Sequence, residues 1–113
     1  TPTGNPYDVT AGDAIGTGDT AVTVPGDTTT VANCLIALIL AHRSDAAIPQ
    51  ASGWANATLT ELTEQIDVDT TSSTGYGIAV ATGVKAAAGT VDPTTATLLT
   101  SVTQARIMIA FKP

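Results

Sequence analysis

The segment from Tyr76 to Val84 alternates large and small side chains without interruption. The large ones share one parity: Tyr76, Ile78, Val80, Thr82 and Val84. The small ones share the other: Gly77, Ala79, Ala81 and Gly83. A period of two places successive side chains on opposite faces of a pleated sheet, so the pattern predicts a β-strand with one large apolar face and one nearly bare face.

We expect the large apolar face of this strand to point into a hydrophobic core. The small face permits another layer or another chain to approach closely, and glycine in a strand interior otherwise weakens the strand. Two interpretations of the small face stay open: tight packing within the domain, and contact with another subunit. The candidate contact residues on this face are Gly77, Ala79 and Ala81.

The composition favours one all-β domain. A chain of 113 residues has room for one core, and 43% hydrophobic residues are enough to form it. Threonine is the commonest residue, only 12% of residues are charged, and 10 glycines and 6 prolines supply turns. This mixture is typical of many short strands rather than helices.

The charge excludes two classes of partner. The net charge is −6, with only 4 lysines and arginines in the chain, whereas binding a phosphate backbone needs clustered basic residues. The same deficit disfavours a membrane surface, and the longest apolar run, Cys34 to Ala41, is far shorter than the roughly 20 residues that span a bilayer. We therefore expect neither nucleic acid nor membrane as a partner.

The first 18 residues differ from the rest of the chain. Residues 1–18 are rich in Gly, Pro, Asp and Thr, and they contain few large apolar side chains. We expect an extended arm that lies across a neighbouring subunit, with Pro6, Tyr7 and Val9 as its anchors. The alternative, in which these residues form an integral strand of the domain, stays open. Residues 19–113 are expected to form the domain itself.

Further strands are predicted across residues 19–113. The run from Val31 to His42 is apolar on both parities, which fits a central strand covered on both sides or, less well, a short buried helix. Trp54 to Val68 is interpreted as a strand with a bulge or loop near Asn56. With about seven or eight short strands, we expect a two-layer antiparallel β-sandwich of jelly-roll-like topology. The core candidates are Trp54, Tyr76, Ile78, Val80, Val84, Ile107, Ile109 and Phe111.

Few residues offer catalytic chemistry. His42 has no nucleophile marked near it, so a histidine at a strand end on the surface is the favoured interpretation. Cys34 lies in the most hydrophobic run and is expected to be a small buried hydrophobe rather than a reactive thiolate. Trp54 could stack on a sugar, but a core position is favoured because of the area that tryptophan buries.

The carboxylates can be interpreted either as catalytic groups or as solvated surface groups. Glu61 with Glu64, or Asp67 with Asp69, could be paired for glycoside cleavage, but their spacing fits a solvated strand edge equally well. Asp67 to Thr70 alternates oxygen ligands yet lacks the glycine and distal glutamate of a helical calcium loop. We therefore expect no catalytic residues, no cofactor and no metal, and a protein that is not an enzyme.

The order of several landmarks resembles a known family. The landmarks are Ser52-Gly53-Trp54, Leu62-Thr63-Glu64-Gln65, Gly75 to Val80, Ala86-Ala87-Ala88-Gly89 and the terminal Ala105 to Pro113. In this order they are similar to a family of small β-sandwich domains in virion proteins of tailed bacteriophages. The resemblance covers about Ala21 to Pro113 and leaves out the first residues.

The resemblance implies a structural role in a virion, on the capsid surface or in the tail. The function that we expect is that of a capsid decoration protein, which binds the head lattice and stabilises it. Its partners would be the major capsid protein or neighbouring virion subunits, and a homo-oligomer on the particle is expected. The alternative is a receptor- or glycan-binding module of a tail fibre.

Overall fold

The computed structural model of the chain describes residues 4–44, 50–70 and 75–113. Within these ranges it contains strands and no helix. The strands are β1 (Tyr7–Val24), β2 (Thr28–Thr29), β3 (Cys34–His42), β4 (Ala51–Ala55), β5 (Thr60–Asp69), β6 (Gly77–Lys85), β7 (Gly89–Thr90) and β8 (Thr94–Phe111). Every pairing between them is antiparallel, so the predicted all-β antiparallel class is confirmed.

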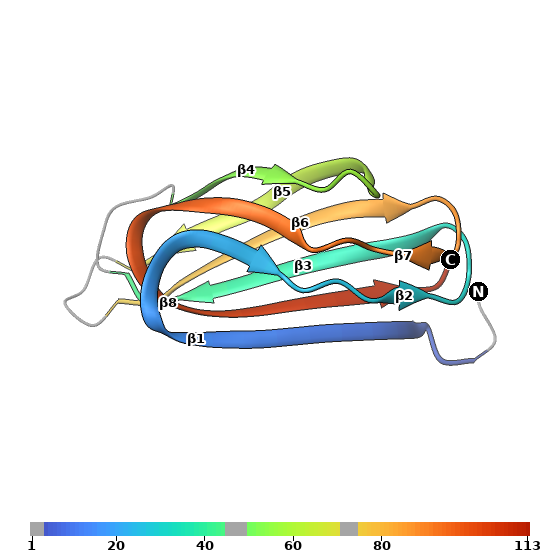
Figure 1. Cartoon of the computed structure of the whole chain (residues 1–113), viewed down its shortest axis with the longest axis horizontal. Coiled ribbons are helices and arrows are strands. Elements are labelled where there is room, and N and C mark those ends of the chain that lie inside the picture. Colours follow the sequence, from blue (N-terminus) through green and yellow to red (C-terminus); the bar gives the residue numbers. More distant parts are fainter. Residues whose placement is uncertain (1–3, 45–49, 71–74) are drawn as a thin grey trace.

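The strands pair in a nested order. The larger sheet runs β1-β8-β3-β6-β5, with β4 also pairing with β8, and β2 pairs with β7 in a separate small sheet. The first strand thus pairs with the last, the second with the seventh and the third with the sixth (Figure 1). A long hairpin that rolls up into two layers produces this order, which is that of a jelly roll. The jelly-roll-like sandwich predicted from the strand count is confirmed.

β1 and β8 are each 18 residues long and contribute to both layers. The first part of β1, Tyr7 to Ile15, pairs with Phe111 to Gln104 of β8. The last part, from Asp19 on, pairs with the beginning of β8, and register shifts on both sides of Asp19 mark the bend. Figure 1 shows both ribbons curling at one end of the molecule and returning over the sheet. One layer, called here the large layer, therefore consists of Tyr7 to Ile15 of β1, Gln104 to Phe111 of β8, and the strands β3, β6 and β5.

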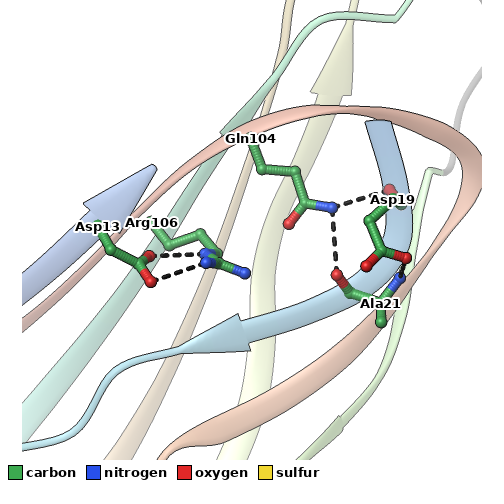
Figure 2. A network of polar contacts seen from close by, with 5 residues as sticks. All are labelled: Asp13, Asp19, Ala21, Gln104 and Arg106. Carbon is green, nitrogen blue, oxygen red and sulfur yellow. Dashed lines mark hydrogen bonds and ion pairs between the residues drawn. The ribbon is translucent and has the colours of Figure 1, made fainter. Parts of the chain in front are cut away.

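Two buried side chains of β8 hold β1 beside this bend (Figure 2). The Nε2 of Gln104 donates to the carbonyl oxygens of Asp19 at 2.9 Å and Ala21 at 3.2 Å. Two residues further along, Arg106 forms a two-pronged ion pair with Asp13, with both N–O distances 2.7 Å. Gln104 thus donates to backbone carbonyls at the register shift, and Asp13 supplies the carboxylate that a buried guanidinium requires.

The core lies between the two layers. The large layer contributes Ile36, Leu38, Leu40, Ala79, Ala81, Met108 and Ala110. The returning halves of β1 and β8, together with β4, contribute Val22, Val24, Ala51, Ala96 and Leu98. The β3 run that is apolar on both parities is a central strand between β8 and β6, as predicted, and not a helix.

The predicted orientation of β6 is wrong. Ala79 and Ala81 are fully buried, whereas Ile78 is 40% exposed and Tyr76 is 66% exposed. The small residues face the core because bulky groups already fill the space above them. A Cβ at Gly77 would overlap the imidazole of His42, and a Cβ at Gly83 would lie 3.3 Å from the Cβ of Leu59.

The other core candidates follow the same correction. On β8, Met108 and Ala110 are buried and Ile107 is 42% exposed, so the inward parity is again the opposite of the predicted one. The remaining outward candidates are only partly buried: Val80, Val84, Ile109 and Phe111. Trp54 is partly buried and packs against the core cluster, and its indole Nε1 donates to Oε2 of Glu64 at 2.7 Å. For Trp54 the predicted core contact is therefore present.

The prediction of an N-terminal arm is wrong from Tyr7 onward. Residues 7–18 belong to β1, so the alternative of an integral strand describes them. Val9 packs against the core of its own domain instead of anchoring to a neighbour, whereas Pro6 and Tyr7 are exposed. Backbone pairing with β8 orders a segment whose own composition predicts little structure, because each ladder bond satisfies a polar group on both strands.

Candidate interface on the outer face of the large sheet

The outward side chains of the large layer form four rows across its five strands. Residues directly opposite each other in a sheet share a face, so the rows follow from the pairing register. From β1 to β5 the rows are Tyr7-Phe111-Leu35-Val84-Thr60, Thr10-Ile109-Ala37-Thr82-Thr63, Gly12-Ile107-Ile39-Val80-Ile66 and Ala14-Ala105-Ala41-Ile78-Val68. We call these 20 positions the apolar face.

The apolar face contains no charged residue. Its polar side-chain groups are four threonine hydroxyls and the hydroxyl of Tyr7, and the amide of the bulge residue Gln65 donates to the hydroxyl of Thr82 on the same face at 2.9 Å. Its large aliphatic side chains are open to solvent to an unusual degree, with Val68 51%, Ile66 47% and Leu35 47% exposed. Single exposed aliphatic residues are common on protein surfaces, but a contiguous patch of this kind marks an interaction site.

The apolar face has relief as well as hydrophobicity. Ile39 and Ile107 pair across β3 and β8 and form a ridge, and Ala41 and Ala105 pair in the next row. An open hollow of about 320 Å³ lies over these two alanines, with Tyr76 and Arg43 among its lining residues. Small side chains beside a ridge of isoleucines therefore leave a recess that another surface can fill.

Tyr76 stands between two recesses at the end of β6. It lines the hollow over Ala41 and also a second hollow of about 300 Å³ that Val68 and Ile78 border. With 66% of its surface exposed, its ring is the most open aromatic group among the described residues. Sequence reasoning placed this side chain in the core, so its availability for contact is a finding of the structure.

The acidic residues have structural partners away from the apolar face. Oδ2 of Asp67 accepts the backbone N–H groups of Gln50 and Ala51, both at 2.8 Å, and so ties the start of β4 to β5. Asp8 accepts hydrogen bonds from the hydroxyl and the N–H of Thr30, and these lower the pKa of Asp8 below its ordinary value of 3.8. These contacts stabilise the fold.

Cys34 and His42 are both inside the sandwich. Cys34 is fully buried, as predicted, and burial together with the nearby carboxylate of Asp8 raises the pKa of its thiol. The prediction of a surface position for His42 is wrong, because only 3% of it is exposed and its ring lies against Gly77. Cys34 has no exposed surface, whereas His42 also lines the open hollow beside Ala41.

The predicted contact residues of β6 are not on the surface. Gly77, Ala79 and Ala81 all face the core, so they cannot touch another subunit. The signal that could have identified the outward face is the run Cys34 to Ala41, which is apolar on both parities. Such a strand has two apolar faces. When the core covers one of them, the other must be covered by something else.

Within the ranges that the structure describes, no three His, Cys, Asp or Glu side chains are grouped as metal ligands. The same ranges hold no helix long and apolar enough to cross a membrane. The fold and the apolar face define a small jelly-roll-like sandwich with exposed apolar side chains on one sheet face. Comparisons with protein-family models, with curated proteins and with solved structures found no match to this chain.

Proposed function

We propose that this chain is a non-enzymatic structural protein of a bacteriophage virion, and that it decorates the capsid and stabilises the head lattice. The apolar face is the observation that carries the proposal. It consists of 20 uncharged positions on a five-stranded sheet, which is the character of a surface buried against another protein subunit. The sequence landmarks that resemble phage virion domains direct the proposal to a virion.

The mechanism is mechanical. Covering several hundred Å² of apolar surface contributes on the order of 10 kcal/mol before the costs of association are subtracted. A protein that binds the assembled lattice but not its separated subunits stabilises the lattice by mass action, so the effect depends on occupancy. The partners in this proposal are the major capsid protein or neighbouring virion subunits, and neither nucleic acid nor a membrane is included.

The test uses capsid shells that lack their decoration protein. The purified chain should bind such shells at a fixed number of copies per shell, raise their melting temperature, and leave host cells unbound. Ile107→Glu, on the apolar face, should lower the stability that bound chain confers on the shells. Leu99→Glu is the matched control, because Leu99 is 70% exposed and lies outside the apolar face. Binding to host cells without binding to shells would contradict the proposal.

One observation supports a second function, a receptor- or glycan-binding module of a tail fibre. Exposed aromatic rings stack on sugars, and Tyr76 stands open between two hollows. In that case Tyr76→Ala should abolish binding to host-cell glycans while the apolar-face variant Ile107→Glu leaves it intact. Mass spectrometry of purified virions separates the two functions, because decoration requires hundreds of copies and a fibre only a few.

A further inference from the structure

We infer that the apolar face is covered by the apolar face of a second copy of this chain, so that the protein forms a two-fold dimer with the two large layers packed face to face. This inference rests on the proposed role of the apolar face as an assembly surface and names a second copy, a neighbouring virion subunit, as the partner on it, so that the dimer meets the capsid lattice through its other surfaces. Three features of the described residues favour a second copy as the occupant.

The first feature is the distribution of charge. Two copies of a chain with net charge −6 repel each other, and this repulsion is weakest where they meet on a surface without charge. The 20 positions of the apolar face exclude all of the chain's acidic and basic residues. A partner of opposite charge would gain from acidic groups at the contact, and this face provides none.

The second feature is the area. Five strands about 4.8 Å apart and four alternate residues about 6.8 Å apart give a face of about 650 Å². Two such faces in contact bury about 1,300 Å², which is within the range of about 1,200 to 2,000 Å² found for specific interfaces. One sheet face is therefore large enough, without any further surface, to hold a dimer together.

The third feature is the relief, which is self-complementary. The large side chains of Phe111 and Leu35 lie in the first row of the face, and the hollow over Ala105 and Ala41 lies in the last row. A two-fold axis between the faces, parallel to the rows and through the middle of the four rows, covers the whole face and places Phe111 and Leu35 of each copy over the hollow of the other. Such an interface is isologous, and aligned sheets pack about 10 Å apart in this manner.

The experiment measures the mass of the purified chain by sedimentation over a wide concentration range. The wild-type chain should have twice the mass of one copy at micromolar concentration. Ile107→Glu places an unpaired charge at the contact and should raise the dissociation constant at least about 100-fold. Ala105→Trp fills the hollow without adding charge, and it should also produce monomers. Leu99→Glu should remain dimeric, because Leu99 is equally apolar and more exposed but lies outside the face.

Circular dichroism and melting curves of each variant verify that the monomer is folded. Ile107 and Ala105 are both exposed, so each substitution leaves the core unchanged, and either variant alone suffices if the other fails to fold. A wild-type chain that is monomeric at all concentrations would overturn the inference. So would a trimer, or a dimer that persists in both apolar-face variants. Shell binding by a monomeric wild-type chain would retain the decoration function while rejecting the dimer.

Discussion

At the scale of single residues, β6 shows how volume decides which face of a strand is buried. The strand has a bare face and a bulky face, and the bare face points inward. It does so because Ile36, Leu38 and Leu40 of the neighbouring β3 already fill the interior, together with the ring of His42. Cores are packed to a fixed density, so large side chains on one strand require small ones beside them.

This arrangement predicts opposite outcomes for neighbouring substitutions. Ala79→Asp should prevent folding or cost about 4 kcal/mol or more, because a carboxylate would be buried without a partner. Ile78→Asp should change the free energy of unfolding by about 1 kcal/mol or less, because Ile78 is 40% exposed. Urea unfolding at a concentration low enough to keep the chain monomeric measures both. Equal losses from the two substitutions would contradict the orientation of β6.

A second prediction concerns the pH dependence of stability at Asp8. The hydrogen bonds from Thr30 lower the pKa of Asp8 in the folded state below its ordinary value of 3.8. A carboxylate of this kind contributes stability above the unfolded pKa and loses it as pH falls through the folded pKa. The difference in urea midpoint between wild type and Asp8→Asn should therefore be constant above about pH 5 and shrink below about pH 4.

Thr30→Val tests the cause of this pH dependence. It removes the hydroxyl that donates to Asp8 and keeps the backbone N–H bond, so the pH dependence should weaken without disappearing. If the urea midpoint of the wild type changed with pH in the same way as that of Asp8→Asn, the charge of Asp8 would add no stability.

At the scale of elements, the bend shared by β1 and β8 creates the second layer. Register shifts interrupt the ladder on both sides of Asp19, and the amide of Gln104 supplies donors for two carbonyls there. Glycine at position 18 is needed for a separate reason, since a Cβ there would lie 3.2 Å from the carbonyl oxygen of Ser101. A side-chain amide thus replaces ladder bonds that the curvature removes.

Gln104→Met should therefore destabilise the protein by about 1 to 2 kcal/mol, because the carbonyls of Asp19 and Ala21 lose the donor that the buried Gln104 supplies. The control is Gln65→Met, on the exposed surface of β5, where the amide donates to the hydroxyl of Thr82 at 2.9 Å. That change should cost about 0.5 kcal/mol or less. Chemical denaturation measures both, and limited proteolysis near residues 16–20 should be faster only in the Gln104 variant. Equal stability of the two variants would show that Gln104 does not hold the bend.

At the scale of the whole molecule, the two ends of the chain depend on each other. The first strand pairs with the last along nearly the full length of both, and the backbone N–H of Lys112 donates to the carbonyl of Pro6 at 2.6 Å. Residues 7–18 also supply Asp13, the partner of the buried Arg106. The segment that composition marks as an arm is therefore part of the folded unit.

A chain that begins at Asp19 should fail to fold. It leaves an edge of β8 unpaired, removes Val9 and Ala11 from the core, and leaves the buried guanidinium of Arg106 without its carboxylate. The loss of these contacts together is comparable to the whole stability of a small domain, about 5 to 15 kcal/mol. A chain that begins at Asn5 should retain the melting temperature of the full chain. A cooperative transition at an unchanged temperature in the chain from Asp19 would contradict the integral role of β1.

The sequence alone determines the strands and the class of fold. The alternation from Tyr76 to Val84 and the apolar run of β3 predict strands because side chains in a strand alternate between faces. The same rule states which residues share a face but not which face is inside. That choice depends on the volume that residues distant in sequence, such as His42 and Leu59, bring to the same space.

Only the tertiary structure decided the interface and the first strand. The apolar face becomes a single surface when β5, β6, β3 and β8 pair in one register, and no local pattern contains that register. Residues 7–15 carry few apolar side chains, and they are ordered by hydrogen bonds to a strand nearly 100 positions away. Local periodicity therefore defines the elements, whereas long-range pairing and packing volume decide which surfaces are buried and which remain open for a partner.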